Sequence, residues 1–342
     1  MTELLRFTES RLSLIEGESL ALVGGAAREL ALSLVGLRPI ARNVASIGIF
    51  DLARVPVADR RFAYVGAQDG LAPHKTIAAN VAQPLRPPAG LIAQALELVG
   101  MIGRGEQPVA ALSRYDRQRV AFARALAGRP RLLVLDDPVA ELPPGAQSLL
   151  RRLVQKIHQT RHELTILLVT ERREDALMLA DRIAVLEGSR VLQVGTPREL
   201  YQNPNSDVVA VALGDVNLLP GRVMSYDGEV AVVMLEGFGA EVEAMAPSGC
   251  GVGMQGVVAI RPERVAIASS LVAEAGDHSL RAKFVDEAFL GDVVLLRFVL
   301  DDGTIISVKR PSAAPLGGLA PGRKVALAWQ PAAARILVSG LE

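Results

Sequence analysis

The sequence has no long hydrophobic run, although 50% of its 342 residues are hydrophobic. A helix that crosses a membrane needs about 18 or more consecutive apolar residues. The longer apolar segments, such as residues 132–135 and 164–169, have only the length of buried strands. The N-terminal segment MTELLRFTESR is charged and has no apolar core of the kind found in secretory signals. We therefore expect a cytoplasmic chain without a transmembrane helix.

Cysteine is nearly absent, and the histidines are not clustered. The single Cys250 excludes an internal disulfide and fits a reducing compartment. His158 and His162 are one helical turn apart, but they lie in a polar stretch and form no zinc-type pattern. Basic and acidic residues balance at 37 each, and aromatic residues make up 4% of the chain. Such a chain lacks the basic surface of a nucleic-acid-binding protein, so no nucleic-acid partner is expected.

Residues 1–200 alternate short apolar runs with amphipathic helical patterns. This alternation is typical of a mostly parallel sheet covered by helices, and such folds bind ligands at the carboxyl ends of the strands. The expected strands span residues 20–23, 62–65, 131–135, 164–169 and 182–186. The expected helices include residues 27–36, 120–127, 149–159 and 175–180.

The pattern changes after residue 205. Short alternating strands appear there, separated by turn signals such as Asp227-Gly228 and Asp302-Gly303. Residues 295–300 and 304–309 flank the second of these turns and are expected to form a β-hairpin. This half is therefore expected to be all-β, as a small barrel. The two domains are predicted to span residues 1–211 and 212–342.

Two neighbouring motifs point to a family. Residues 112–126 read LSRYDRQRVAFARAL, and residues 131–138 read RLLVLDDP. Their order and spacing resemble the signature helix and Walker B strand of ABC-type ATPases, which read LSGGQ-x-QRVA-x-ARAL and end in DEP. Residues 64–76 (YVGAQDGLAPHKT) resemble the Q-loop region of that family, and residues 169–183 (VTERREDALMLADRI) resemble its switch segment.

The C-terminal half carries a second resemblance. Its segments GDVNLLPG (214–221), IRPE (260–263), FLGD (289–292) and VALAWQP (325–331) are similar to the TOBE domain of ABC importer subunits, with polyamine, iron and phosphonate importers nearest. Together, the resemblances imply an α/β P-loop NTPase-like ABC domain, with a mostly parallel sheet, helices and a reduced helical subdomain. An all-β, OB-like TOBE barrel is expected to follow it.

The resemblance also implies cofactors and partners. ATP-binding subunits of ABC importers bind ATP and Mg²⁺ and form head-to-tail dimers. They act on transmembrane permease subunits, which receive solute from a solute-binding protein. The chain is thus expected to lie peripherally on the inner face of the plasma membrane. The motifs do not identify the solute, because polyamine, iron, phosphonate, sugar and polyol importers share this architecture.

The phosphate-binding loop of the family is abbreviated in this chain. A P-loop reads GxxxxGK[ST]: its backbone amides wrap the phosphates, its Lys neutralises them, and its Ser or Thr holds Mg²⁺. Here only Gly24, Gly25 and Ala26 precede Ala27, which takes the Lys position. Gly24, Gly25 and Arg28 are the residues left to bind phosphate. In the alternative that preserves a site, Arg28 replaces the lysine.

Two further nucleotide contacts of the family are altered. Gln68 lies one residue after the position of the Q-loop glutamine, so it is either a Mg²⁺ ligand or a polar loop residue. In the signature, Ser113 is kept as a nucleotide contact, but Arg114 and Tyr115 replace the two glycines and Asp116 replaces the Gln. Ser-x-x-Asp is also a capping box. We therefore expect Asp116 to fold back onto the N-terminus of its own helix.

The resemblance assigns roles to three acidic residues. Asp136 is the Walker B carboxylate that orders Mg²⁺ in the family. Asp137 stands in place of the catalytic Glu and is one methylene short of the attacking water, a large error for a general base. Glu171 stands in place of the switch His, where a carboxylate repels a γ-phosphate. Both catalytic positions are therefore expected to be impaired.

These departures predict a subunit with little or no ATPase activity alone. It is expected to pair with a second, intact ABC ATPase subunit as a heterodimer, since a self-dimer would have no working site. One alternative is a slow but functional transport ATPase that uses Arg28, Asp136 and Asp137. Another is a regulatory or structural module whose barrel senses a small molecule or a partner protein.

Overall fold

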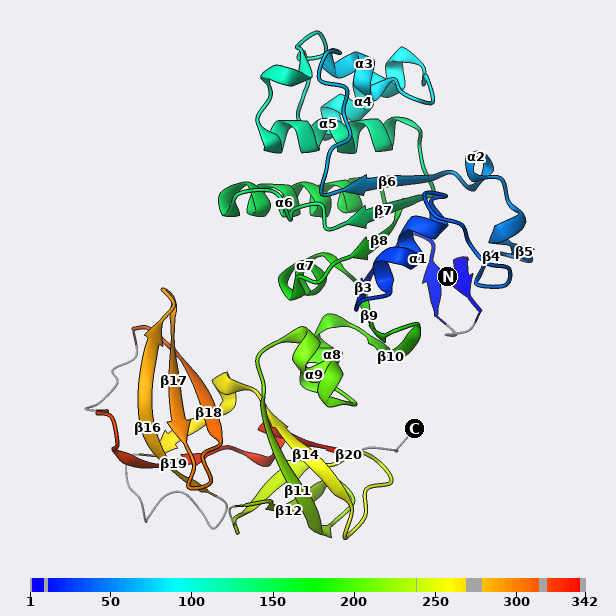
Figure 1. The fold of residues 1–342 in the computed structure, drawn as a ribbon. Coiled ribbons are helices and arrows are strands. Elements are labelled where there is room, and N and C mark those ends of the chain that lie inside the picture. Colours follow the sequence, from blue (N-terminus) through cyan, green and yellow to red (C-terminus); the bar gives the residue numbers. More distant parts are fainter. Residues whose placement is uncertain (1, 9–11, 238, 269–278, 314–318, 339–342) are drawn as a thin grey trace. The chain divides into compact units, whose positions relative to one another are not determined.

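The computed structural model describes residues 2–8, 12–237, 239–268, 279–313 and 319–338 (Figure 1). The chain forms two compact units, Met1–Leu200 and Tyr201–Glu342. The boundary falls within helix α8 (Pro197–Gln202). Within the described ranges, every helix is too short or too polar to cross a membrane.

The first unit is built on a six-stranded sheet with the order β10-β9-β3-β8-β7-β6. All neighbouring pairs are parallel except the edge strand β10, which is antiparallel to β9. Strands β3, β7 and β8 are buried along their whole length, as is typical of parallel sheets. The bounds are β3 (Ser19–Val23), β6 (Phe62–Gly66), β7 (Leu132–Asp136), β8 (Thr165–Val169), β9 (Arg182–Glu187) and β10 (Arg190–Gly195). The expected mostly parallel sheet is therefore confirmed.

A smaller antiparallel sheet with the order β2-β1-β4-β5 completes the core of this unit. Its strands are β1 (Glu3–Phe7), β2 (Ser13–Ile15), β4 (Ala45–Ile47) and β5 (Phe50–Asp51). Leu5 and Leu14 from this sheet join Leu22 of β3 in one buried hydrophobic cluster. The same cluster includes Ala31 and Leu34 of the first helix, so it fixes that helix against both sheets.

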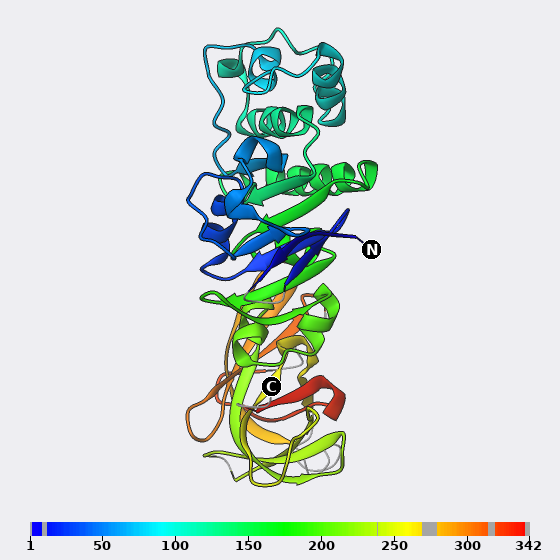
Figure 2. The same cartoon turned by 90° about the vertical axis from the view of Figure 1, so that its right-hand side faces the viewer.

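Helices pack on the sheet and extend beyond its β6 edge. Helix α1 contacts β7 and β8, and α7 contacts β3. Helices α3, α4 and α5 form the reduced helical subdomain expected from the sequence, and α5 contacts β6 (Figure 2). The bounds are α1 (Ala27–Leu34), η1 (Leu52–Arg54), α2 (Val57–Arg60), α3 (Ile77–Val81), α4 (Ala89–Leu98), η2 (Val109–Ala111), α5 (Arg114–Ala127), α6 (Pro144–Thr160) and α7 (Arg173–Leu179).

The second unit is all-β apart from short helices, as expected. A closed barrel contains β11 (Asn217–Tyr226), β12 (Val230–Leu235), β13 (Glu241–Met245), β20 (Ala334–Val338) and β14 (Gln255–Ile260). A five-stranded sheet contains β15 (Ala266–Ala268), β19 (Lys324–Ala328), β16 (Leu280–Phe289), β17 (Val293–Val299) and β18 (Ile305–Pro311). Two 3-10 turns, η3 (Pro262–Arg264) and η4 (Pro331–Ala333), lie between strands. The sequence predicted the β17–β18 hairpin, but not that this second sheet is separate from the barrel.

Helix α9 (Asp207–Leu213) belongs to the second unit, although the sequence-based boundary was drawn after residue 211. Ala210 packs against Ala259 of β14 and Leu337 of β20. The guanidinium of Arg261 donates hydrogen bonds to the carbonyl oxygens of Ala210 (2.8 Å) and Gly214 (3.0 Å). These contacts attach the helix to the barrel.

Candidate functional site

A three-residue link joins β3 to α1 at the carboxyl edge of the sheet. It consists of Gly24, Gly25 and Ala26. Gly24 has a φ of +136°, and a Cβ atom there would lie 2.2 Å from the carbonyl oxygen of Leu186. Glycine is therefore required at this position by the close approach of β9. The amide of Ala27, at the family's Lys position, donates to Gly24 O at 3.1 Å.

Arg28, in the first turn of α1, reaches the end of β7. Its Nε atom donates to Asp136 Oδ2 at 3.0 Å, and Tyr64 Oη donates to the same oxygen at 2.7 Å. The Asp136 side chain is only 3% exposed, whereas the Arg28 side chain is 68% exposed. The charge of Asp136 raises the pKa of Arg28. Burial and the hydrogen bond to Asp136 raise the pKa of Tyr64.

Tyr64 was not recognised as a site residue in the sequence, although it lies in the Q-loop segment. In the β6–β7 register, Gly66 is opposite Asp136 and Tyr64 is opposite Val134. Residues two apart on a strand share a face, so the Tyr64 side chain passes over Gly66 towards Asp136. A Cβ atom at Gly66 would lie 2.7 Å from the Tyr64 hydroxyl. The glycine thus provides the space that the Tyr64–Asp136 contact needs.

Asp137 is held by the neighbouring strand. Its Oδ1 atom accepts a 2.6 Å hydrogen bond from Thr170 Oγ1, and that hydroxyl accepts from the amide of Arg172 at 3.0 Å. The Asp137 backbone is left-handed, with φ at 44°, and its amide donates to Val169 O at 3.0 Å. Glu171, at the position of the switch His, is exposed in the turn after Thr170.

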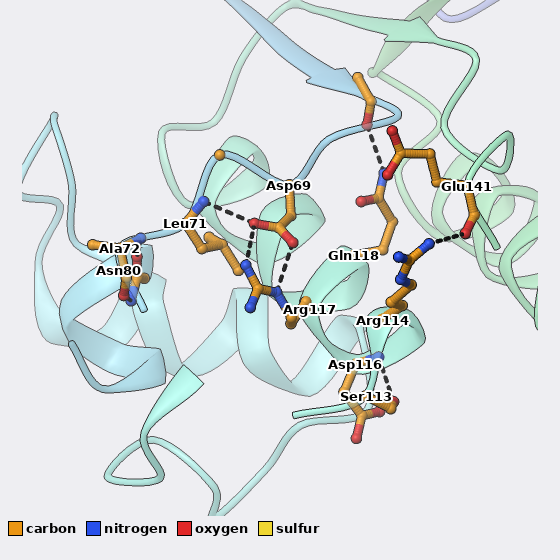
Figure 3. Close-up of polar contacts among 12 residues, drawn as sticks. Asp69, Leu71, Ala72, Asn80, Ser113, Arg114, Asp116, Arg117, Gln118 and Glu141 are labelled. Atoms are coloured by element: carbon orange, nitrogen blue, oxygen red, sulfur yellow. Dashed lines mark hydrogen bonds and ion pairs between the residues drawn. The ribbon is translucent and has the colours of Figure 1, made fainter. Parts of the chain in front are cut away.

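Gln68 lines a second feature, a surface cavity of about 550 Å³ between the Q-loop segment and α5. Arg117 and Asp69 line the same cavity, and Arg117 makes two hydrogen bonds to Asp69, at 2.7 and 3.2 Å (Figure 3). Arg114 reaches the carbonyl oxygen of Glu141 at 3.2 Å. Gln68 is therefore placed among signature-helix residues, while the carboxylate of Asp136 is engaged by Arg28 and Tyr64.

The N-terminus of α5 is capped by Ser113, as its sequence predicts, but not by Asp116. Ser113 Oγ accepts a 3.1 Å hydrogen bond from the amide of Asp116. The Asp116 carboxylate was expected to fold back on the helix end. It instead pairs with Arg119 and, at 3.3 Å, with Arg104. Two nearby guanidinium groups stabilise a carboxylate more than a single backbone amide does, because charge-assisted hydrogen bonds are stronger than neutral ones.

The arrangement defines a class of protein. A mostly parallel sheet carries a glycine link into α1 and two consecutive acidic residues at the carboxyl end of a buried strand, and a small helical subdomain contains a signature-type helix. This combination is the nucleotide-binding fold of ABC transporters.

Comparisons with known proteins agree with this class. The chain matches the family model described as ABC transporter over residues 40–140 and the one described as TOBE domain over residues 258–337. It is 35% identical over 274 residues to the spermidine/putrescine import ATP-binding protein PotA of Pseudomonas aeruginosa, covering 78% of this chain and 74% of the relative. It is 32% identical over 332 residues to the PotA protein of Rubrobacter xylanophilus, covering 93% and 86%. The Fe(3+) ions import ATP-binding protein FbpC of Rhizobium etli is 31% identical over 283 residues, covering 80% and 77%.

A solved structure shows the same fold. The cbiO1 chain from Clostridium perfringens, part of the ABC transporter complex cbiONQ, matches with a TM-score of 0.53 at 19% identity. The match covers 59% of this chain and 92% of that chain. The protein therefore belongs to the family of ABC importer ATP-binding subunits that carry a C-terminal TOBE domain. ATP and Mg²⁺ are the cofactors of this family.

Proposed function

We propose that the chain is an ABC importer subunit that has lost ATP hydrolysis and acts as the non-catalytic half of a heterodimer. An intact ABC ATPase subunit is its partner. The pair acts on transmembrane permease subunits at the inner face of the plasma membrane, and a solute-binding protein supplies the solute. The observation that carries the proposal is the Arg28–Asp136 ion pair beside the three-residue link.

The link supports a loss of phosphate binding. A P-loop places five residues between its first Gly and its Lys, whereas two residues, Gly25 and Ala26, separate Gly24 from Ala27. The Ala27 amide is already bonded to Gly24 O, so it is not available to a phosphate. Glu29 adds an exposed carboxylate in the first turn of α1, where a bound anion would otherwise be stabilised by the helix N-terminus.

The carboxylates support a loss of metal binding and of general-base catalysis. A Mg²⁺ ion held through Asp136 would have to compete with the Arg28 guanidinium and the Tyr64 hydroxyl for one oxygen. Asp137 is shorter than the Glu it replaces and accepts a hydrogen bond from Thr170. A base must lie within hydrogen-bond reach of the water it activates. These residues therefore do not fit Mg²⁺–ATP in the way the family uses it.

The family match covers part of the first unit. It spans residues 40–140, so it includes Asp136 and Asp137 but not the Gly24–Arg28 segment or Glu171. The matched residues also include helices α3, α4 and α5. The relatives are named for spermidine/putrescine and Fe(3+) import. They agree on import and differ in solute, so the proposal specifies no solute.

Binding of a fluorescent ATP analogue with Mg²⁺ tests the proposal. The purified chain is measured alone, the intact ATPase subunit alone, and then both together, with phosphate release followed in parallel. We expect the chain alone neither to bind the analogue nor to hydrolyse ATP. The mixture should hydrolyse ATP, and Asp137→Asn in this chain should leave that rate unchanged. Turnover by the chain alone that Asp137→Asn abolishes would show a functional ATPase and overturn the proposal.

A further inference from the structure

We propose that Arg28 is a built-in cation, which holds the position at Asp136 that a divalent metal ion would take. The proposal builds on the loss of metal binding in the proposed function. Its test, however, measures the stability and metal response of the isolated chain, not ATP turnover, so either proposal can fail while the other stands.

The buried carboxylate of Asp136 needs a compensating positive charge. Its side chain is 3% exposed at the carboxyl end of β7. A buried ionised carboxylate is costly unless a cation or several hydrogen-bond donors compensate it. The Arg28 guanidinium supplies the charge at 3.0 Å, and the Tyr64 hydroxyl supplies a second donor at 2.7 Å. The carboxylate is therefore compensated by side chains of its own chain.

Arg28 occupies a position that its own helix does not favour for a cation. Arg28 is the second residue of α1. A cation in the first turn opposes the helix macrodipole, which favours acidic residues there. Arg28 is nevertheless directed at Asp136, and α1 is fixed by its contacts with β7 and β8. Arginine suits this role because its charge persists at every physiological pH and its guanidinium is weakly hydrated.

One carboxylate oxygen of Asp136 joins α1, β6 and β7 through Arg28 and Tyr64. Gly66 is the residue that lets Tyr64 reach this oxygen. Side chains of the chain itself thus brace the carboxyl edge of the sheet. We infer that millimolar Mg²⁺ leaves this edge unchanged in the wild-type chain, and that removal of Arg28 exposes a carboxylate able to take up a divalent ion.

The test follows the melting temperature of the full chain with and without millimolar Mg²⁺ or Mn²⁺, with Mn²⁺ binding measured directly by electron paramagnetic resonance. Arg28→Ala is expected to lower the melting temperature by about 3–6 °C, a range set by loss of one compensating charge. The divalent ion should restore part of that loss. Arg38→Ala is the matched control, since it removes a similarly exposed arginine that lies 3.8 Å from Glu29. It should show neither effect.

The Asp136→Asn variant tests whether Arg28 stabilises the chain through its ion pair with Asp136 or through some other contact. In the Asp136→Asn background, Arg28→Ala should cost no stability, and Mn²⁺ should not bind. If Arg28→Ala alone fails to fold, recovery of folding in the double variant supports the proposal, and failure to recover overturns it. The proposal is also overturned if the wild-type chain binds Mn²⁺ in a way that Asp136→Asn abolishes, or if Arg28→Ala neither lowers the melting temperature nor gains a metal response.

Discussion

Thr170 donates a 2.6 Å hydrogen bond from Oγ1 to Asp137 Oδ1, and so joins the residue that follows β8 to the residue that follows β7. Asp137 holds a left-handed backbone with φ at 44°. Aspartate and asparagine tolerate this conformation better than longer side chains do. The residue in the position of the catalytic base is therefore suited to a local structural role.

The first prediction concerns restoration of the family's glutamate. Asp137→Glu should produce no phosphate release above an Asp137→Asn blank, because the short Gly24–Ala26 link and the paired Asp136 remain. The longer side chain should also destabilise the chain by about 1 kcal/mol, through its left-handed backbone and the disturbed Thr170 contact. Asp137→Asn keeps the favourable backbone preference and should be milder. ATP turnover by Asp137→Glu alone would contradict this account.

The second prediction concerns the hydroxyl of Tyr64. Tyr64→Phe removes a hydrogen bond to a buried carboxylate and should lower the free energy of unfolding by about 1–3 kcal/mol. Gly66→Ala should have a similar effect, since its Cβ would lie 2.7 Å from that hydroxyl. Urea unfolding of the full chain measures both variants. Tyr226→Phe is the control, because its solvent-facing hydroxyl bonds to Gly228 O. Equal effects of the two tyrosine variants would count against a special role for Tyr64.

Features that depend on neighbouring residues could be predicted from the sequence, whereas features that depend on long-range packing could not. The runs 132–136 and 165–169 are uniformly apolar, so their burial as central strands could be predicted. The contact of Tyr64 with Asp136 could not, because it depends on the register of two strands 70 residues apart in the sequence. The sequence suggests for Arg28 only the role of a phosphate-binding Lys. Its direction towards Asp136 emerges from the packing of α1 on β7 and β8.

The same distinction applies to the second unit. The alternating sequence of residues 295–300 and 304–309 and the Asp302-Gly303 turn between them are local signals, and they predicted the β17–β18 hairpin. The division into a closed barrel and a separate sheet depends on which strands pair, as in β15 with β19. Periodicity does not determine such long-range pairing.

The third prediction concerns pH and the Arg117–Asp69 ion pair. Burial raises the pKa of Asp69, but hydrogen bonds from Arg117 and the Leu71 amide outweigh it and leave the pKa below its ordinary value of 3.8. The folded chain therefore binds this proton more weakly than the unfolded chain. The pair's contribution to stability is then present above the unfolded pKa and is lost as pH falls through the lower folded pKa.

Arg117→Met should accordingly lower the free energy of unfolding by about 1 kcal/mol at neutral pH. The difference from the wild-type chain should shrink below about pH 4. Urea unfolding of the wild-type and Arg117→Met chains across this pH range gives a difference in stability from which the contributions of other carboxylates cancel. Arg297→Met breaks an exposed pair with Asp286 and serves as the control, with little effect expected. A difference that stays constant into acid would contradict the assignment.

The fourth prediction concerns Arg261, which lies in the IRPE segment and is 6% exposed. Its guanidinium donates to the carbonyl oxygens of Ala210, Gly214, Asp215 and Tyr201, at 2.8, 3.0, 3.1 and 3.2 Å. It also lies over the Tyr201 ring, 4.1 Å from the centroid. A planar guanidinium can serve several carbonyls and a ring at once, whereas an ammonium group cannot.

Arg261→Lys should therefore lower the free energy of unfolding of the second unit by about 2–4 kcal/mol, although the charge is kept, because buried carbonyl oxygens lose their donors. Calorimetry of the full chain measures the effect. Arg264→Lys, three residues further on, alters an exposed arginine whose contact with Ala332 O is 3.4 Å long, and should change little. If the two lysine variants were equally mild, α9 would be held to the barrel mainly by the apolar contacts of Ala210 with Ala259 and Leu337.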